Sequence, residues 1–343
     1  MSELRTVEWA HGHVRMIDQT QLPTRLVYVE LRDYRQVSKA IRNMTVRGAP
    51  AIGVAAAMGM ALAARANRAR KKDRFFKELE VAGETLKASR PTAQNLFWAV
   101  DRILERARNT SPGEDVAKAV IEEALRMAEE DVEANHSLGR FGAALIVDGD
   151  QVLTHCNTGT LATVNYGTAL APIRTAVREG KSVRVVATET RPRLQGAKLT
   201  AYELLSDRIP VTLIVDGAVG YVMSRGMVQR AIVGADRITA RFVANKVGTY
   251  LIALAAKANQ IPFYIAAPTS TFDIRSGISE IKVEERAPRE VTHINGNRIP
   301  PRGVPVYNPA FDLTPVELVS GFITEKGVFT PAQLATDPSS IQA

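Results

Sequence analysis

Short apolar runs alternate with helical patterns beyond about residue 138, and this alternation limits the possible folds more than any other feature of the chain. The expected strands are 143–147, 151–155, 182–187, 211–215, 231–234 and 263–267. The expected helices are 162–179, 199–206, 220–225 and 247–259. Elements in this order form a parallel sheet covered by helices on both faces. We therefore expect an α/β fold with a Rossmann-like C-terminal domain over residues 138–343.

The first 137 residues are predicted to be mainly helical, with small strands near their start. Extended pieces are expected at 14–19 and 25–31, and an amphipathic helix at 34–44, where apolar residues recur at spacings of three and four. Helical patterns return over 73–133, with breaks at 89–92 and 111–113. Residues 1–137 are therefore expected to form a helical N-terminal domain.

The segment 51–64 is uniformly apolar and rich in small residues, which predicts a buried helix rather than a surface one. Pro50 suits the first turn of this helix, where a missing N–H costs nothing. Arg47, Gly48 and Ala49 then lie where free N–H groups of a helix N-terminus attract a phosphate. Arg90 also stands just before an expected helix start, so the two arginines suggest one bound anion. A solvent-facing side chain is an equally common role for either one.

The chain carries a net charge of +8, from 44 Lys and Arg against 36 Asp and Glu. Such an excess suits a polyanionic partner or an anionic substrate. One local cluster stands out, at Arg65, Arg68, Arg70, Lys71, Lys72, Arg74 and Lys77. Because it lies at the end of a helix, we favour a solvated helix face over nucleic-acid contact. No nucleic-acid partner is expected.

The cellular compartment is suggested by the single cysteine, which cannot form an internal disulfide and so favours a reducing environment. The first residues lack the basic-then-apolar pattern of a signal peptide. No uninterrupted apolar run approaches the ~20 residues that span a bilayer. We therefore expect a cytoplasmic protein that does not contact a membrane.

Polar or nucleophilic residues follow the expected strands, at the edge of the sheet where ligands bind in α/β folds. They are Cys156, Glu189-Thr190-Arg191, Asp216, Asp236 and Pro268-Thr269-Ser270. A sheet with a purely structural role does not require this pattern.

Cys156 and Asp236 are the two strongest candidates for chemistry, and each has a simpler alternative. An expected helix start near residue 162 and nearby arginines would favour a Cys156 thiolate; a buried cysteine acting as a small hydrophobe is the commoner role. Asp236 is either a helix N-cap or a carboxylic acid that donates a proton from a dry pocket. His155 faces away from Cys156 on a strand, so it is a poor direct partner.

The patterns of common cofactor sites are missing from the sequence. There is no HxxxH, no cysteine pair, no Asp-rich calcium loop, no Walker A loop and no G-x-G-x-x-G. The residues therefore favour a reaction on a small phosphorylated molecule without a metal or a nucleotide cofactor.

The chain resembles the methylthioribose-1-phosphate isomerases of methionine salvage, which share a fold with ribose-1,5-bisphosphate isomerases and regulatory subunits of initiation factor 2B. The resemblance runs from about Val7 to Thr330. The motifs that carry it are Val46-Arg-Gly-Ala-Pro-Ala-Ile-Gly53, Ser89-Arg-Pro-Thr92 with Asn95-Leu-Phe-Trp98, His155-Cys-Asn-Thr-Gly159, Glu189-Thr-Arg-Pro-Arg-Leu-Gln-Gly196, Gly234-Ala-Asp-Arg-Ile238, Ala244-Asn-Lys-Val-Gly-Thr-Tyr250 and Asn308-Pro-Ala-Phe-Asp-Leu-Thr-Pro315.

The resemblance implies a homodimer in which Cys156 and Asp236 are the catalytic pair. It also implies a set of substrate-binding residues, namely Arg47, Gly48, Ala49, Arg90, Gln195, Asn245 and Lys246. One departure concerns the gap between Asp236 and the Asn245-Lys246 pair, where many members carry an Asn-Gly-Asp segment. Here Thr239-Ala-Arg-Phe-Val243 fills this gap, which is a residue shorter. The shape of this loop is therefore open.

The activity that the resemblance implies is aldose–ketose isomerisation of 5-methylthioribose 1-phosphate to 5-methylthioribulose 1-phosphate. The alternatives are a ribose-1,5-bisphosphate isomerase and a non-catalytic regulatory subunit like those of initiation factor 2B. The first would need a second cation cluster in place of an apolar pocket for the methylthio group.

Overall fold

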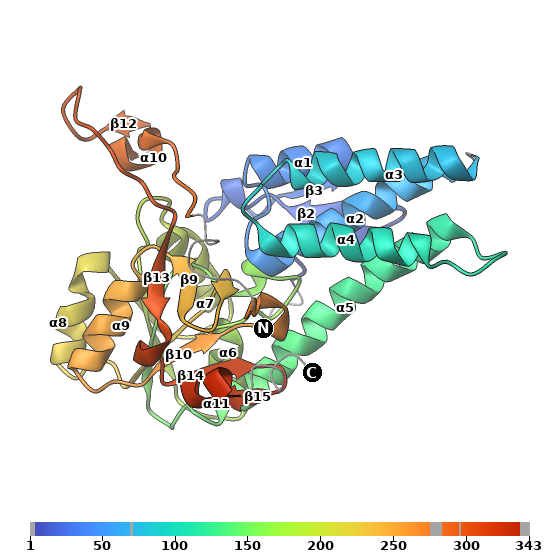
Figure 1. Cartoon of the computed structure of the whole chain (residues 1–343). Coiled ribbons are helices and arrows are strands. Elements are labelled where there is room, and N and C mark those ends of the chain that lie inside the picture. Colours follow the sequence, from blue (N-terminus) through green and yellow to red (C-terminus); the bar gives the residue numbers. More distant parts are fainter. Residues whose placement is uncertain (1–3, 69–70, 275–282, 295, 337–343) are drawn as a thin grey trace. The chain divides into compact units, whose positions relative to one another are not determined.

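Figure 1 shows a computed structural model of the chain, which describes residues 4–68, 71–274, 283–294 and 296–336. The fold separates into two compact units. The N-terminal unit runs to His136 and takes in the segment Gly159–Gly167. The C-terminal unit consists of Ser137–Thr158 and the chain from Thr168 onward. A nine-residue segment that follows the Cys156 turn is thus part of the N-terminal unit.

The N-terminal unit combines a small antiparallel sheet with a helical bundle. Its sheet has the order β1 (Val7–Ala10), β2 (His13–Ile17), β3 (Tyr28–Leu31). Its helices are α1 (Tyr34–Arg42), α2 (Ala49–Asn67), α3 (Lys72–Lys87), α4 (Gln94–Arg108) and the first part of α5 (Val116–Ala143). The helices α1, α3 and α4 all pack against α2 (Figure 1). The expected helical N-terminal region is present.

The helix α2 forms the core of this unit, as its small apolar residues predict. Fourteen consecutive residues, Ala51–Ala64, are buried. The glycines Gly53 and Gly59 allow close packing, because a Cβ on Gly53 would lie 2.9 Å from the Asn95 carbonyl oxygen. At 19 residues α2 passes the length and hydropathy test for a membrane span, contrary to our expectation that no run approaches that length. Because 78% of the apolar stretch of α2 is buried within the structure, α2 behaves as a core helix.

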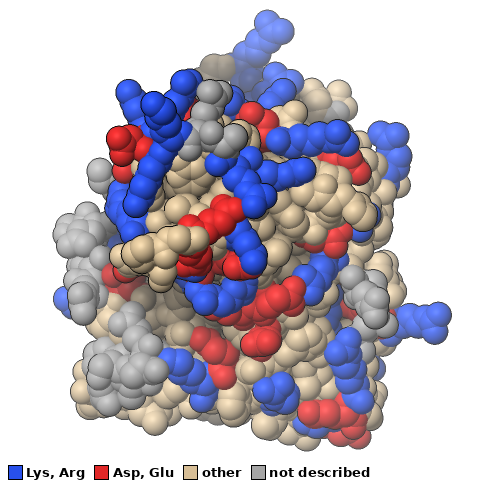
Figure 2. Space-filling view, turned by 90° about the vertical axis from the view of Figure 1, so that its right-hand side faces the viewer, with Lys and Arg blue, Asp and Glu red and all other residues tan. Residues whose placement is uncertain are grey.

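Charges of both signs alternate on the surface of the helical bundle. Arg68 pairs with Asp115 at 2.5 Å, and Arg102 pairs with Glu123 and Glu130 at 2.6 Å each. Figure 2 shows Lys and Arg interspersed with Asp and Glu on one face of the molecule. Arg70 of the basic cluster lies outside the described residues. Of the basic cluster, Arg68 therefore has an acidic neighbour in Asp115, which fits a solvated helix face.

The C-terminal unit is built on a seven-stranded sheet of order β15-β14-β10-β7-β4-β5-β6. All neighbouring strands are parallel except β14 and β15. The strands are β4 (Gln151–Thr154), β5 (Arg184–Thr188), β6 (Val211–Ile214), β7 (Arg230–Val233), β10 (Phe263–Ala266), β14 (Gly321–Thr324) and β15 (Gly327–Phe329). The expected α/β fold class with a largely parallel sheet is confirmed.

Helices of this unit follow the strands. They are α6 (Leu170–Arg178), a π-helical turn η3 (Gly196–Thr200) leading into α7 (Ala201–Ser206), α8 (Val219–Ser224) and α9 (Thr249–Ala258). The short α11 (Pro331–Thr336) ends the described chain. Figure 1 shows α8 and α9 packed side by side.

Two elements expected from the sequence are wrong. The run 143–147 is not a strand, because α5 continues to Ala143 and ends in turns in which Leu145 and Ile146 donate to Gly142 and Ala143. The helix expected from residue 162 begins only at Leu170. Tyr166, with a φ of 70°, and Gly167, with a φ of 89°, interrupt the backbone before it. A short apolar run cannot distinguish a strand from a helix end by periodicity.

A second antiparallel sheet holds β8 (Arg237–Ile238), β9 (Phe242–Lys246) and β13 (Phe311–Pro315), with β9 in the middle. The segment before β13 contains the short elements α10 (Pro288–Thr292), β11 (His293–Ile294) and β12 (Asn297–Arg298). The strand β13 forms because it pairs with β9, whose residues lie about 70 positions away in the chain.

Candidate functional site

Cys156 lies two residues after β4, in a strained backbone conformation. Its φ is 62°, in the left-handed region that a residue with a Cβ rarely adopts. Two threonines hold this conformation: the Cys156 N–H donates to Thr190 Oγ1 at 2.9 Å, and Thr200 Oγ1 donates to the Cys156 carbonyl at 2.6 Å. The residue is 8% exposed. Because α6 begins at Leu170, the expected helix N-terminus near residue 162 does not act on the thiol.

A buried polar network supports the turn that carries Cys156. Asn157 donates to Glu203 at 2.8 Å, and Glu203 in turn pairs with Arg174 at 2.8 Å. Arg174 also pairs with Asp207 at 2.7 Å. All four residues are buried or nearly so, and such a network favours one conformation even where it adds little stability.

Asp236 follows β7 by three residues and is partly buried. Its backbone N–H donates to the Ala244 carbonyl at 2.9 Å. The residues after it form the strand β8, so the interpretation of Asp236 as a helix N-cap is wrong. The backbone just before it passes close to the Cys156 turn, since a Cβ on Gly234 would lie 2.5 Å from Thr158 Cγ2.

The two candidate residues follow neighbouring strands at the point where the strand order reverses. From β4 the chain adds β5 and β6 on one side, and β7, β10 and β14 on the other. β4 and β7 are hydrogen-bonded neighbours, with Leu153 opposite Ala231. Ligands of open α/β sheets bind at the carboxyl ends of strands at such a switch point. Cys156 follows β4 and Asp236 follows β7, the two strands between which this switch point lies.

The expected substrate-binding residues of the C-terminal unit are buried. Gln195 precedes the π-helical turn, and its Oε1 finds no hydrogen-bond partner among the described residues. A buried acceptor of this kind suits a ligand hydroxyl. Asn245 donates to Thr249 Oγ1 at 3.0 Å. Lys246 Nζ donates to the Ala310 carbonyl at 2.7 Å and lies 4.7 Å from the centroid of the Phe311 ring.

In the N-terminal unit, Arg47, Gly48 and Ala49 stand at the start of α2, as expected. Gly48 is the N-cap of α2 with a φ of 94°, and a Cβ there would lie 2.4 Å from the Ala162 carbonyl oxygen. Arg47 Nε donates to Gln19 Oε1 at 3.2 Å. The other end of the Gln19 amide donates to the Leu161 carbonyl at 2.8 Å. Arg90 precedes α4 and is partly buried.

Sequence reasoning missed Gln19 and Thr200, which hold Arg47 and Cys156. Neither belongs to a local pattern, so no signal in the sequence singles them out. Asp216 was noted only for its position after a strand. Its carboxylate accepts the N–H groups of Thr190 and Arg191 at 2.7 Å each, and so fixes the loop to which Cys156 is bonded.

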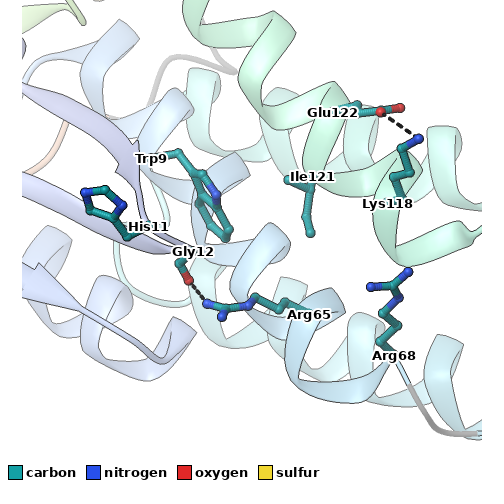
Figure 3. A pocket seen from close by; sticks show the side chains of 8 residues that line it. All are labelled: Trp9, His11, Gly12, Arg65, Arg68, Lys118, Ile121 and Glu122. Atoms are coloured by element: carbon teal, nitrogen blue, oxygen red, sulfur yellow. Dashed lines mark hydrogen bonds and ion pairs between the residues drawn. The ribbon is translucent and has the colours of Figure 1, made fainter.

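A pocket of about 460 Å³ lies in the N-terminal unit, away from the start of α2 (Figure 3). It is lined by Trp9, His11, Gly12, Arg65, Arg68, Lys118, Ile121 and Glu122. None of these residues was expected to bind substrate. Among the described residues, no cluster of His, Cys, Asp or Glu could hold a metal ion.

Comparison with known proteins identifies the family. The model of the initiation factor 2 subunit family matches residues 45–331. A methylthioribose-1-phosphate isomerase of Acetivibrio thermocellus is 52% identical over 96% of this chain and 97% of its own length. The chain belongs to this family, among its methylthioribose-1-phosphate isomerases. The resemblance expected from the motifs is thereby confirmed.

Solved structures of this isomerase family share the whole fold. A crystal structure of 5-methylthioribose 1-phosphate isomerase from Pyrococcus horikoshii OT3 has a TM-score of 0.91 and 43% identity, covering 99% of this chain and 96% of that one. A structure described as translation initiation factor eIF-2B, subunit delta, from A. fulgidus has a TM-score of 0.89 and 46% identity, covering 99% and 100%. The fold therefore serves proteins that are described as enzymes and as factor subunits.

Proposed function

We propose that this chain converts 5-methylthioribose 1-phosphate to 5-methylthioribulose 1-phosphate in methionine salvage. The observation that carries the proposal is the placement of Cys156 and Asp236 after the two adjacent strands at the switch point of the sheet. An isomerase needs one group that moves a carbon-bound proton and one that protonates the ring oxygen. A thiol and a carboxyl group at this edge supply both.

The phosphate on C1 prevents the sugar from opening freely to an aldehyde, so the enzyme opens the ring with that phosphate in place. Asp236, protonated, donates to the ring oxygen as the C1–O bond breaks. The Cys156 thiolate removes the proton from C2, and a C1–C2 double bond forms. Cys156 then returns that proton to C1 while the C2 hydroxyl gives its proton to Asp236 and becomes the ketone. Both residues end in their starting protonation states.

The substrate is held by Arg47, Gly48, Ala49, Arg90, Gln195, Asn245 and Lys246. Backbone N–H groups near Gly48 and Gly159, with the cations Arg47, Arg90 and Lys246, bind the phosphate of the substrate and of the enol intermediate. The Gln195 acceptor takes a sugar hydroxyl. Apolar surroundings keep water from the intermediate.

A hydride shift from C2 to C1 is the alternative chemistry, and it needs no base. Turnover in deuterated water separates the two routes. Deuterium at C1 of the product supports transfer through Cys156. Its complete absence argues for hydride transfer or for a proton that is fully shielded from solvent.

Two other functions are tested by the same purified protein. Ribose 1,5-bisphosphate is assayed beside 5-methylthioribose 1-phosphate, and the proposal requires the methylthio sugar to give the higher kcat/KM. The likeness to a structure described as an initiation factor subunit favours a regulatory role as the second candidate. Lack of turnover with both sugars, together with capture of initiation factor 2, would establish that role instead.

We further propose a cytoplasmic homodimer. Exposed apolar side chains on the C-terminal unit support it: β6 is an edge strand of the sheet, and Leu213 on it and Val215 just after it are 48% and 59% exposed. Tyr221 on α8 and Leu251 on α9 are 67% and 69% exposed. Exposed edges and apolar patches of this kind mark sites of association.

A further inference from the structure

We propose that His155 is a positioning residue: as a neutral imidazole protonated on Nε2, it sets the backbone of Cys156 and of the Lys246 turn together. This inference rests on the proposed function of Cys156 and Lys246. His155 and Cys156 face opposite ways on the strand. His155 therefore acts on Cys156 through hydrogen bonds and not by direct contact with the thiol.

The two ring nitrogens of His155 have different partners. Nε2 lies 2.9 Å from the carbonyl oxygen of Val247, and Nδ1 lies 2.6 Å from Thr188 Oγ1. A carbonyl oxygen only accepts, so Nε2 must carry a proton. In the neutral ring Nδ1 is then an acceptor, and the Thr188 hydroxyl donates to it.

This assignment orders the hydrogen bonds that lead to Cys156. The Thr188 hydroxyl donates its proton to His155, so Thr188 Oγ1 can only accept from the Thr190 hydroxyl, 3.2 Å away. The Thr190 hydroxyl also has the Thr188 carbonyl oxygen within reach as an acceptor, at 3.3 Å. The oxygen of Thr190 in turn accepts the Cys156 N–H at 2.9 Å. When Thr190 donates to Thr188 Oγ1, every donor from the Cys156 N–H to the Val247 carbonyl points the same way. Bonds aligned in this manner strengthen one another.

Burial keeps His155 in this state. The residue is 1% exposed, and desolvation is the main cause that lowers its pKa to about 4. The charge of Lys246 lowers the pKa further, whereas the bond to Val247 and the charge of Asp216 oppose the shift. The imidazole is therefore neutral throughout the physiological range.

The ring also packs against the turn that follows Lys246. A Cβ on Gly248 would lie 3.0 Å from His155 Cε1, and Gly248 has a φ of 107°, so this turn requires glycine. Asp312 accepts the Gly248 N–H at 2.7 Å from the other side. His155 thus joins the strained Cys156 backbone to the turn that places Lys246.

The tautomer is tested directly on the wild-type protein by ¹⁵N NMR with labelled histidine. The chain has five histidines, and the His155 signals are those lost in His155→Gln. We expect the neutral Nε2–H form at every pH from 6 to 8. An Nδ1–H form, or a charged ring in this range, would overturn the assignment whether or not the protein is an isomerase.

The effect on catalysis is tested with Thr188→Val, which replaces the donor to His155 with a methyl group. We expect kcat to fall by about tenfold to a hundredfold with KM within about threefold, because the thiol is misplaced rather than the substrate lost. Thr188→Ser keeps the hydroxyl and should restore kcat. The matched control is Thr154→Val, on β4 and equally buried, whose hydroxyl has no partner among the described residues.

Unchanged kcat in both Thr188→Val and His155→Gln, in a wild-type protein that turns over substrate, would refute the positioning role. An equal loss of kcat in Thr154→Val would show that the effect of Thr188→Val comes from altered packing and not from the lost hydrogen bond to His155. If the wild-type protein itself shows no turnover, the proposed function fails, and the NMR result still decides the tautomer.

Discussion

At the scale of single residues, the candidate catalytic residue Cys156 is both buried and held in a strained backbone conformation. Cys156 has a left-handed backbone held by Thr190 and Thr200. Strain of this kind costs about 1–3 kcal/mol and persists where the surroundings enforce it. This strain has a functional reason if the backbone must hold the Cys156 thiol close to C2 of the sugar.

Cys156→Ser and Asp236→Asn are expected to lower kcat by about 10² to 10⁴-fold, with little change in KM. The serine hydroxyl is a far weaker base than a thiolate, and the amide cannot supply a proton to the ring oxygen. Steady-state kinetics on 5-methylthioribose 1-phosphate measure both, and circular dichroism checks that the variants fold. Near-full turnover by the serine variant would end the thiolate role.

Gln19 is expected to orient Arg47 toward the phosphate, because its buried amide bridges Arg47 and the Leu161 carbonyl. Gln19→Ala should lower kcat/KM by about tenfold, and the Arg47→Ala background should remove most of that effect. A double-mutant cycle measures the coupling. Gln21→Ala, in the same short turn, is the control. Full additivity of Gln19→Ala and Arg47→Ala would show that the two act separately.

At the scale of elements, α5 holds the segment 159–167 of the N-terminal unit. Asp131 accepts the Val164 N–H at 2.7 Å, and Asn135 donates to the Asn165 carbonyl at 3.2 Å. The rings of His136 and Tyr166 stack with centroids 4.1 Å apart. Two successive turns of one helix thus hold the segment that begins at Gly159, next to the Cys156 turn in the chain.

Asp131 should make the N-terminal unit less stable as the pH rises. Burial raises the pKa of Asp131 to about 7, so the folded unit binds this proton more tightly than the unfolded chain does. The resulting stability is complete below the ordinary pKa and is lost as the pH rises through about 7. Relative to Asp131→Asn, the wild-type protein should lose about 3 kcal/mol between pH 5 and pH 8.

Urea unfolding followed by tryptophan fluorescence measures this loss, because both tryptophans, Trp9 and Trp98, lie in the N-terminal unit. Burial also raises the pKa of Asp312, to about 6. Asp312 is present in both proteins, so its effect on the free energy of unfolding cancels in their difference. A difference between wild type and Asp131→Asn that does not change with pH would contradict the prediction.

At the scale of the whole molecule, the exposed apolar residues of β6, α8 and α9 predict how two copies associate. Tyr221→Glu and Leu251→Glu should each shift the protein from dimer to monomer, since a buried unpaired carboxylate costs several kcal/mol. Analytical ultracentrifugation measures the mass. Val81→Glu is the control, because Val81 on α3 is also exposed, at 47%, but lies in the other unit. Dimers that persist in both variants would place the interface elsewhere.

The sequence by itself determined the class of fold, the family and the candidate residues. Short apolar runs and a uniformly apolar stretch of small residues are local patterns, so five of the six strands expected beyond residue 138 and the core helix α2 were found from them. The division at residues 137 and 138, and the site roles, stay predictions. Cys156 could be assigned to the site because it lies within a contiguous motif, His155-Cys-Asn-Thr-Gly159, that carries the family resemblance.

Only the tertiary structure decided which residues meet. The strand order that makes β4 and β7 neighbours depends on pairing between residues about 80 positions apart, which no local pattern encodes. The same is true of β13 against β9, of Gln19 against Leu161, and of Thr188 against His155. Propensity acts over a few residues, whereas the contacts that hold Cys156 in its conformation arise when distant segments pack and must satisfy one another's buried polar groups.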